Sequence, residues 1–325
     1  MGDFPPLSFA SIASAGSRIR FGWLPDPPDS RDYTKGSPKV APLLRIPSIV
    51  PSLVDLRAFC PPIFDQGELG SCTANAASAL LQYHRMRTLG KTGPLSRLFI
   101  YKGTRDLMQA AGDTGAYIRT TMGALALFGA PPEKYWEYDA KMLDIAPPAF
   151  CYSYAQNYQA LSYFRLDEKS ESAGTNPAEK SKNAPVKPES IAEKSKTAAT
   201  NDKRTVTKEP ALILSNIKET LSSGLPAMFG FTVYESMNGA SNGKIPFPSE
   251  NERVLGGHAV LCVGYDDKME IGSQRGAFLI RNSWGEGWGE KGYGWLPYEY
   301  LLQGIAQDWW VLVKAEWVET EQFGV

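Results

Sequence analysis

A long polar segment divides this chain into two halves of different residue pattern, and it limits the fold more than any other feature. Residues 167–210 contain no Leu, Phe, Trp, Tyr or Met, and their charges balance among Lys, Glu, Ser, Ala and Pro residues. Such a segment cannot bury enough apolar surface to offset the entropy lost when it is ordered. We therefore expect a disordered, low-complexity insertion between two folded parts.

The half before the insertion favours helices, and the half after it favours strands. Apolar residues recur at helical spacing from Cys72 to Leu89, between a capping Ser71 and Gly90, and further helical patterns cover 96–111 and 118–129. After a short helix at 213–222, strand-like runs occupy 226–234, 258–265, 277–282 and 309–313. This order predicts an α+β fold with a natural cleft between two subdomains.

The first 47 residues are rich in proline and small residues and have neither helical nor strand periodicity. Trp23 and Tyr33 flank a polyproline-like stretch, which favours an extended segment that docks on a surface. We interpret 1–47 as an N-terminal extension and prosegment. The other parts are a mainly helical subdomain at 48–166, the insertion at 167–210 and a β-rich subdomain at 211–325.

Charge and composition exclude several classes of partner. With 34 basic and 35 acidic residues the formal charge is −1, so no overall field favours nucleic acid or an anionic membrane. No apolar run approaches the roughly 20 residues that cross a bilayer. The N-terminus lacks a basic signal-peptide region, which predicts a cytoplasmic or non-classically exported protein. We expect a monomer that binds neither nucleic acid nor membrane.

The four cysteines and two histidines show no Cys-x-x-Cys or His-x-x-x-His spacing, so we expect no metal and no cofactor. Cys262 lies in an apolar run typical of a buried strand, where a thiol behaves as a small hydrophobe. Cys60 and Cys151 remain as a pair that a disulfide could join. The sequence does not decide whether they pair.

Cys72 is the candidate nucleophile. At a helix N-terminus, backbone N–H groups and the helix dipole lower the pKa of a thiol and favour the reactive thiolate. An isolated cysteine is more commonly an inert buried residue, but the preceding run Gln66-Gly67-Glu68-Leu69-Gly70-Ser71 favours catalysis. Gln66 would place its side-chain amide beside the Cys72 N–H, so that both donate to a developing oxyanion.

The base must be His258 or His84, because the chain has no other histidine. His84 is twelve residues along the helix from Cys72, roughly 18 Å away at about 1.5 Å per residue. It cannot reach the thiol, and we interpret it as a helix-surface residue whose charged form is mildly favoured there. His258 follows two glycines and opens an apolar strand, which favours it as the base.

A catalytic histidine needs its second ring nitrogen held. Asn282, at the end of the strand-like run 277–282, is the candidate for this role, and Trp284 could cover the hydrogen bond and exclude water. Taken alone, these would be a turn asparagine and a core tryptophan. The glycine- and tryptophan-rich run from 282 to 293 is too particular for that interpretation.

These residues resemble the papain-like cysteine peptidases over roughly 48–317, outside the insertion. The resemblance implies a helical subdomain, a β-barrel-like subdomain and an active-site cleft between them. It assigns the oxyanion role to Gln66, the nucleophile to Cys72, the base to His258 and the orienting amide to Asn282. The spacing 258 − 72 = 186 falls to 142 without the 44 inserted residues, within the roughly 130–150 expected of the family.

Two positions depart from papain. Leu69 replaces a disulfide-forming cysteine, and Thr73 replaces the usual tryptophan or tyrosine after the nucleophile. Together with an N-terminal segment much shorter than papain's helical propeptide, this resembles a bacterial-type branch. The resemblance also implies that Gly115, Ala116 and Tyr117 offer backbone to an extended substrate. Gly257 leaves room beside His258, and we expect Gly257 and Trp284 to contact the substrate as well.

The function predicted is hydrolysis of peptide bonds through an acyl-enzyme. A histidine-bearing occluding loop is excluded, so endopeptidase action is the default. Acyl transfer to an amine and a non-catalytic peptide-binding module are the alternatives. We further expect the segment from Arg20 to Ile46 to lie along the cleft and keep the enzyme latent, as an intramolecular inhibitor that competes with peptide or protein substrates.

Overall fold

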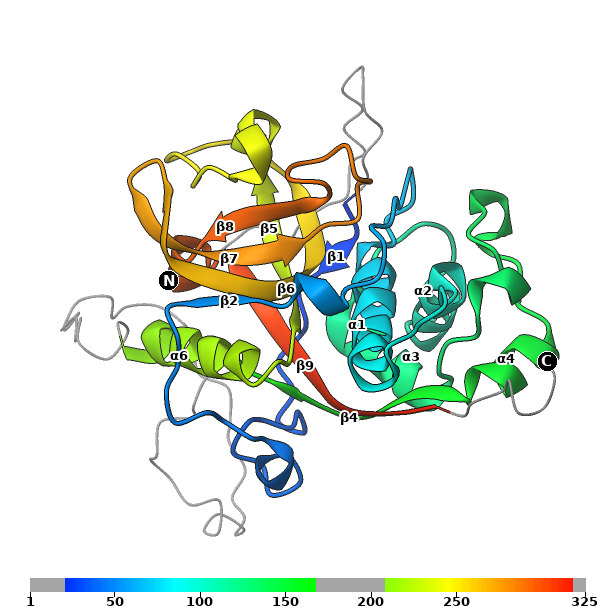
Figure 1. Ribbon diagram of the computed structural model, residues 1–325. Coiled ribbons are helices and arrows are strands. Elements are labelled where there is room, and N and C mark those ends of the chain that lie inside the picture. Colours follow the sequence, from blue (N-terminus) through cyan, green and yellow to red (C-terminus); the bar gives the residue numbers. More distant parts are fainter. Residues whose placement is uncertain (1–20, 168–207, 318–325) are drawn as a thin grey trace, which may run out of the picture.

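The computed structural model describes residues 21–167 and 208–317 (Figure 1), so the predicted disordered insertion lies almost wholly outside the described residues. The helices are α1 (Cys72–Leu89), α2 (Arg97–Leu107), α3 (Ile118–Leu127), α4 (Ala149–Ala155), α6 (Lys208–Ser222) and α7 (Glu299–Leu302). The strands are β1 (Trp23–Leu24), β2 (Leu53–Asp55), β3 (Ala116–Tyr117), β4 (Tyr158–Arg165), β5 (Ala227–Tyr234), β6 (Val254–Ile271), β7 (Gln274–Arg281), β8 (Tyr293–Pro297) and β9 (Ala306–Trp317).

Seven strands form one sheet in the order β4-β9-β5-β6-β7-β8, with β2 paired to β6, and each of these pairs is antiparallel. Strands β6 and β7 form a hairpin whose ends pair at Ile271 and Gln274. Gly272 in the two-residue turn has a φ of +60°, which glycine adopts at little cost. A separate two-stranded parallel sheet joins β1 to β3.

Both faces of the central strands are buried, because successive residues of a strand point to opposite sides. Met228, Leu261 and Leu279 pack with α1 in one apolar cluster. The residues that follow them, Phe229, Cys262 and Ile280, pack in a second cluster on the other face. The helical half therefore covers one face of the sheet, and the strands read as continuous apolar runs.

Helix α1 is the buried helix that joins the two halves, and twelve of its residues, from Cys72 to Tyr83, are inaccessible. It ends as predicted at Gly90, in the left-handed conformation with a φ of 70°. The prediction that Ser71 caps the first turn is wrong. Its hydroxyl makes no cap hydrogen bond and instead contacts the hydroxyl of Tyr138 and the side-chain amide of Asn75.

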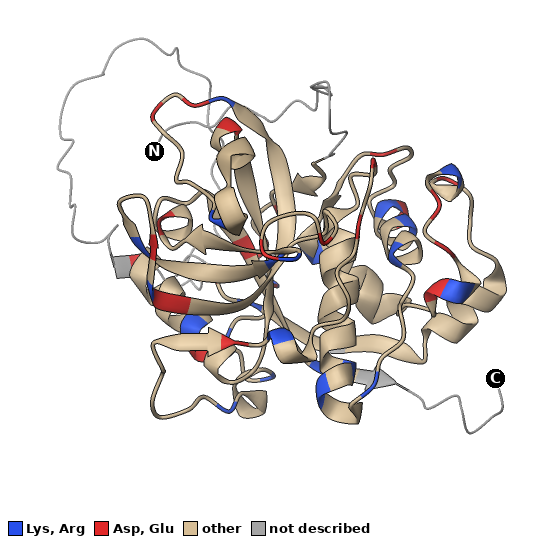
Figure 2. Cartoon of the chain, turned by 45° about the horizontal axis from the view of Figure 1, so that its top comes forward, with Lys and Arg blue, Asp and Glu red and all other residues tan. Residues whose placement is uncertain are grey.

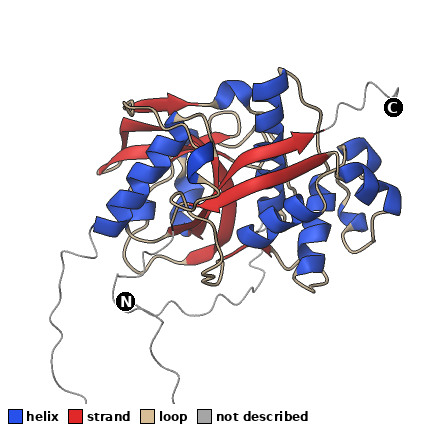
Figure 3. Ribbon diagram, turned by 90° about the horizontal axis from the view of Figure 1, so that it is seen from below, coloured by secondary structure: helices blue, strands red, loops and turns tan. Residues whose placement is uncertain are grey.

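The helices predicted at 96–111, 118–129 and 213–222 correspond to α2, α3 and α6, and the four predicted strands correspond to β5, β6, β7 and β9. Strands β4 and β8 and helix α4 were not anticipated. β4 lies in the part of the chain expected to be mainly helical, yet it pairs with β9, and the two run from the sheet toward α4 (Figures 1 and 3).

The structure answers one question that the sequence left open, the pairing of Cys60 with Cys151, and it contradicts one prediction, that of a charged His84. All four cysteines lie in the described residues and are free; Cys60 packs near α1, whereas Cys151 belongs to a separate cluster around α2 and α4, so they do not form a disulfide. His84 is not a charged surface residue. Burial and the neighbouring Arg87 lower the pKa of its imidazole to about 4, so it is neutral.

Candidate active site

The loop before α1 is fixed by one carboxylate. Asp113 accepts hydrogen bonds from the backbone N–H of Gly70, at 2.9 Å, and from the hydroxyl of Tyr101, at 2.7 Å. The Tyr101 oxygen in turn accepts the N–H of Gly115, at 3.0 Å. This chain of contacts holds the residues preceding Cys72 against the segment that leads into β3. The nucleophile candidate and the predicted substrate edge are thus positioned together.

His258 lies in β6 and Asn282 directly follows β7, the neighbouring strand, and their side chains meet with 2.8 Å between Nε2 and Oδ1. The backbone N–H of Ser283 donates to the same Oδ1 at 2.8 Å. Because that N–H can only donate, the shared atom must be the amide oxygen, and His258 must carry its proton on Nε2. Nδ1 is then the basic nitrogen, and it has no hydrogen-bond partner among the described residues.

Aromatic rings enclose the imidazole. Trp284 stacks on His258 with ring centroids 4.5 Å apart and an angle of 26° between the planes. Phe231 of β5 meets the ring edge-on at 5.9 Å. The His258–Asn282 hydrogen bond lies beside these rings, and both of its residues are 0% exposed.

Gln66 is fully buried and its amide is held at both ends. Its Nε2 donates to the carbonyl of Leu69 at 2.9 Å, and its Oε1 accepts from the hydroxyl of Ser283 at 2.7 Å. The backbone N–H of Gln66 also donates to the Ser283 carbonyl at 2.9 Å. Ser283 therefore orients Gln66 through its side chain and Asn282 through its backbone, a role that the sequence analysis missed.

The N-terminal segment runs through this site. The backbone carbonyl of Gly22 accepts the N–H of Ala116 at 2.7 Å, and Trp23 and Leu24 pair in parallel with Ala116 and Tyr117. A Cβ on Gly22 would overlap the carbonyl oxygen of Gly70, so only glycine fits at this point. The segment from Gly22 to Leu24 thus contacts Gly115, Ala116 and Tyr117, the three substrate-edge residues predicted from the sequence.

The same segment covers the remaining candidates. Phe21 meets His258 edge-on at 6.3 Å and Trp284 at 6.2 Å. Its side chain also packs on Gly256, and the Trp23 carbonyl and ring lie against Gly257. As a result, Cys72 and His258 are both 0% exposed. The predicted catalytic residues and the predicted substrate-contacting residues therefore lie along the same N-terminal segment.

Burial reverses the charge state that the helix N-terminus predicts for the thiol. Desolvation raises the pKa of Cys72 to about 11, and backbone N–H groups of Ala259, Gly22, Thr73 and Cys72 itself only partly offset it. Desolvation likewise lowers the pKa of His258 to about 4, against the hydrogen bond to Asn282. With Phe21 to Trp23 in place, the pair is therefore a neutral thiol and a neutral imidazole.

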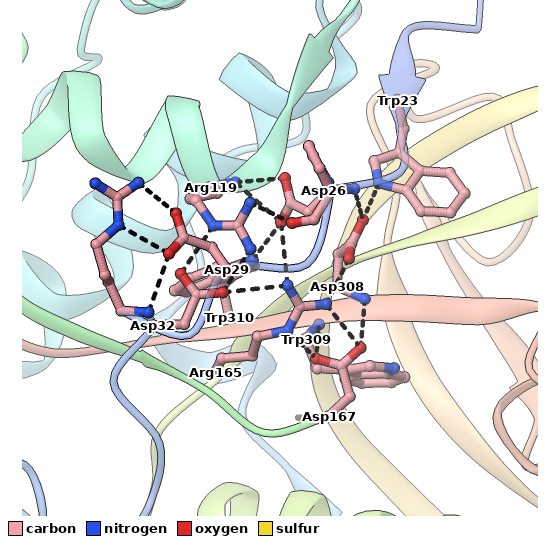
Figure 4. Close-up of polar contacts among 12 residues, drawn as sticks. Trp23, Asp26, Asp29, Asp32, Arg119, Arg165, Asp167, Asp308, Trp309 and Trp310 are labelled. Carbon is pink, nitrogen blue, oxygen red and sulfur yellow. Dashed lines mark hydrogen bonds and ion pairs between the residues drawn. The ribbon is translucent and has the colours of Figure 1, made fainter. Parts of the chain in front are cut away.

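A network of carboxylates and arginines holds the segment beyond Trp23 (Figure 4). We call it the anchor network; its members are Asp26, Asp32, Arg119, Arg165, Asp167 and Asp308. Asp32 is paired with Arg119 through two hydrogen bonds, at 2.8 and 2.5 Å, and Asp26 accepts the indole N–H of Trp310 at 2.8 Å. Elsewhere basic and acidic residues are interspersed along the described chain (Figure 2).

Sequence reasoning did not find the anchor network. Its members are separated by up to 282 residues in sequence, as between Asp26 and Asp308. The one available signal was the concentration of aspartates at 26, 29 and 32 in a segment otherwise poor in charge before residue 31. Arginine partners for such a cluster depend on the pairing of β4 with β9, which was not predicted.

No helix in residues 21–167 or 208–317 has the length and hydropathy to cross a bilayer.

Comparison with known proteins agrees with this geometry. The model of the papain family cysteine proteases matches residues 50–309. An uncharacterized peptidase C1-like protein of Acanthamoeba polyphaga mimivirus is 30% identical, over 90% of this chain and 86% of that protein. The crystal structure of xylellain, a cysteine protease from Xylella fastidiosa, is 31% identical, with a TM-score of 0.67, and covers 95% of this chain and 100% of that one.

A procathepsin B from Trypanosoma congolense shares the fold at 14% identity, with a TM-score of 0.61 over 93% of this chain and 87% of that one. The family match, the two relatives at about 30% identity and the α+β architecture agree with one another. This chain belongs to the papain family of cysteine proteases.

Proposed function

We propose that this papain-like peptidase hydrolyses peptide bonds with Cys72 as nucleophile, His258 as base, Asn282 as the group that orients the base and Gln66 as an oxyanion donor. His258 Nδ1 takes the thiol proton while the sulfur bonds to the substrate carbonyl carbon. The imidazolium then protonates the amine as the peptide bond breaks. Water, deprotonated by the same nitrogen, releases the acid from the acyl-enzyme and restores the thiol.

The tautomer of His258 is the observation that carries this proposal. Ser283 N–H fixes the orientation of the Asn282 amide, and that amide fixes the proton on Nε2, which leaves Nδ1 basic. Nδ1 of His258 has no hydrogen-bond partner in the described residues, so it is available to take a proton.

We further propose that the N-terminal segment keeps the enzyme latent. Phe21, Gly22 and Trp23 occupy the space above Cys72 and His258, and their presence leaves the thiol neutral. A neutral thiol is a poor nucleophile, so the segment acts both by blocking substrate and by suppressing the thiolate. Release of the segment admits water, lowers the pKa of Cys72 and raises that of His258.

Endopeptidase action is the expected specificity, since a protein with only two histidines has no third one to bind a substrate terminus. Ala116 and Tyr117 of β3 can pair with an extended substrate through main-chain hydrogen bonds. Such hydrogen bonds depend little on the side chains of the substrate.

The test uses a thiol-directed epoxysuccinyl inhibitor on the full-length chain before and after cleavage near Pro47. Cleavage should raise the labelling rate of Cys72 and the rate at which an unfolded protein is cut, with fragments arising from internal bonds. Cys72→Ala should abolish both. Full activity in Cys72→Ala would refute the nucleophile assignment, and equal labelling rates before and after cleavage would refute latency alone.

A further inference from the structure

The side chain of Trp23 fills a pocket one residue away from the position where Gly22 meets the Cys72 thiol. We call the space between Ala116, Gly230, Gly257 and Asp308 the Trp23 pocket. A Cβ on Gly230 would overlap the indole ring, and one on Gly257 would lie 2.9 Å from it. The two glycines leave room for a large flat side chain, and Trp23 is 1% exposed there.

The polar end of this pocket is a carboxylate. Asp308 Oδ2 accepts the indole N–H of Trp23 at 3.0 Å and the backbone N–H of Asp26 at 2.8 Å (Figure 4). Its other oxygen, Oδ1, accepts from Arg165 at 2.6 Å. The N-terminal segment thus donates both of these hydrogen bonds to Oδ2, and both are lost when that segment leaves.

Asp308 is also held by contacts outside the N-terminal segment. Its backbone N–H donates to Asp167 at 2.6 Å, and Arg165 fixes one side-chain oxygen. Its φ of +58° is an uncommon conformation for a residue with a side chain, one that persists only where the surroundings impose it. The acceptor therefore stays in position after the segment departs.

We propose that in the open enzyme the Trp23 pocket is a substrate subsite that selects tryptophan, and that Asp308 determines this specificity by accepting the indole N–H. The inference rests on the proposed function, because it requires the segment to vacate a site that cleaves peptides. A substrate tryptophan restores the contact to Oδ2 and fills the space between the two glycines.

The pocket favours an indole over a guanidinium. Arg165 already occupies Oδ1 of Asp308, so an arginine from a substrate would face a like charge close to the same carboxylate. Phenylalanine would leave the buried Oδ2 without a donor, which is unfavourable for a charged acceptor. Tryptophan supplies both the area and the single donor.

The first experiment opens the site in the full-length chain with Gly22→Val, whose side chain cannot pass Gly70. Fluorogenic peptides carry tryptophan, 3-benzothienylalanine, phenylalanine or arginine in turn at each of the three positions before the cleaved bond. Benzothienylalanine has the shape of tryptophan without the N–H. At pH 8, above the pKa of about 7 to which burial raises Asp308, kcat/KM should favour tryptophan over benzothienylalanine about 10-fold at one position.

Asp308→Asn in the same background should reduce that ratio to about 2 or less, because the amide presents a donor to the indole or loses Arg165. The matched control is Asp106→Asn, which changes an exposed carboxylate paired with Lys102 and should leave the ratio unaltered. Equal rates for tryptophan and benzothienylalanine at every position, or a preference for arginine, would overturn the proposal.

A second measurement needs no catalysis. In the full-length chain, Trp23→Phe should raise the rate at which iodoacetamide alkylates Cys72 about 10-fold, and in an Asp308→Asn background the same substitution should have little effect. If this coupling appears while the open enzyme cleaves no peptide, the proposed hydrolysis is wrong and the acceptor contact is real. If peptides are cleaved without coupling or tryptophan preference, the subsite assignment is wrong and the hydrolysis stands.

Discussion

The site around Cys72 and the anchor network hold neighbouring parts of one segment by opposite means. At the thiol, Phe21 and Gly22 make apolar and backbone contacts to groups that burial keeps uncharged. A few residues further on, Asp26 and Asp32 are fixed to Arg119 and Arg165 by charge. The contacts that cover the thiol and the ion pairs that attach the segment are thus made by different residues. Each set of contacts can therefore be changed without changing the other.

The largest effect is expected at Gly22, where the N-terminal segment packs most closely against the loop before Cys72. Gly22→Val in the full-length chain places side-chain atoms on the carbonyl of Gly70, which belongs to the backbone and cannot yield. The segment should leave the site, and alkylation of Cys72 by iodoacetamide should accelerate about 100-fold. The matched control is Gly36→Val in the same segment, where an added Cβ meets nothing within 4 Å. Comparable acceleration in both variants would show that the overlap between residue 22 and Gly70 is not the cause of the faster alkylation.

Weakening the anchor network should raise the alkylation rate of Cys72 by a smaller factor, because only an ion pair is lost. Asp32→Asn removes a carboxylate that is 8% exposed and that pairs with both Arg119 and Arg165. Loss of one partner from such a pair should cost about 2 kcal/mol of docking energy, or about 30-fold in the alkylation rate. Asp29→Asn provides the control, since its partner Arg31 lies on the same exposed turn. An Asp32→Asn rate within 2-fold of that control would mean that the anchor network does not hold the segment.

The pH dependence of alkylation distinguishes a covered thiol from an open one. With its pKa at about 11, Cys72 of the full-length chain should react faster with each step of pH up to that value, because thiolate is formed only as pH rises through the pKa. In Gly22→Val the midpoint should move to lower pH, since water and His258 then stabilise the charged pair. The measurement is the rate against pH for both chains. Superimposable profiles would contradict burial as the cause.

The smallest effect belongs to a residue that acts through another. Ser283→Ala removes the hydroxyl that donates to Gln66 Oε1, and with it one of the hydrogen bonds that orient the Gln66 amide. In the Gly22→Val background, kcat should fall about 5- to 10-fold with little change in KM, because the oxyanion role proposed for Gln66 acts on the transition state. Ser283→Thr, which keeps the hydroxyl, should recover most of the rate. A change confined to KM would argue against the oxyanion role of Gln66.

The sequence was sufficient to predict those parts of the molecule whose structure depends on the pattern of neighbouring residues. Helix α1 follows from apolar spacing and Gly90, and four candidate residues were identified from the runs around Cys72, His258 and Asn282. The protonation of Cys72 was predicted in the wrong direction. A helix N-terminus is a local property, whereas the burial that outweighs it comes from Phe21 to Trp23, some fifty residues away.

Long-range register explains most of what was missed. β4 was not expected because it precedes the polar insertion, and its partner β9 lies near the other end of the chain. Only that pairing brings Arg165 beside Asp308 and so creates the floor of the Trp23 pocket. Ser283 was overlooked for a related reason: its hydroxyl matters only because a residue 217 positions earlier in the sequence lies against it.

The buried, protonated sulfur of Cys72 also has a consequence for redox chemistry. Peroxide and disulfides react with thiolates, and the product of that reaction progresses from sulfenic acid to irreversible acids. A thiol with a pKa of about 11 and no solvent contact escapes this damage. On the latency proposed above, Phe21, Gly22 and Trp23 protect the thiol from oxidation until the segment is released, and the same release exposes it to oxidants.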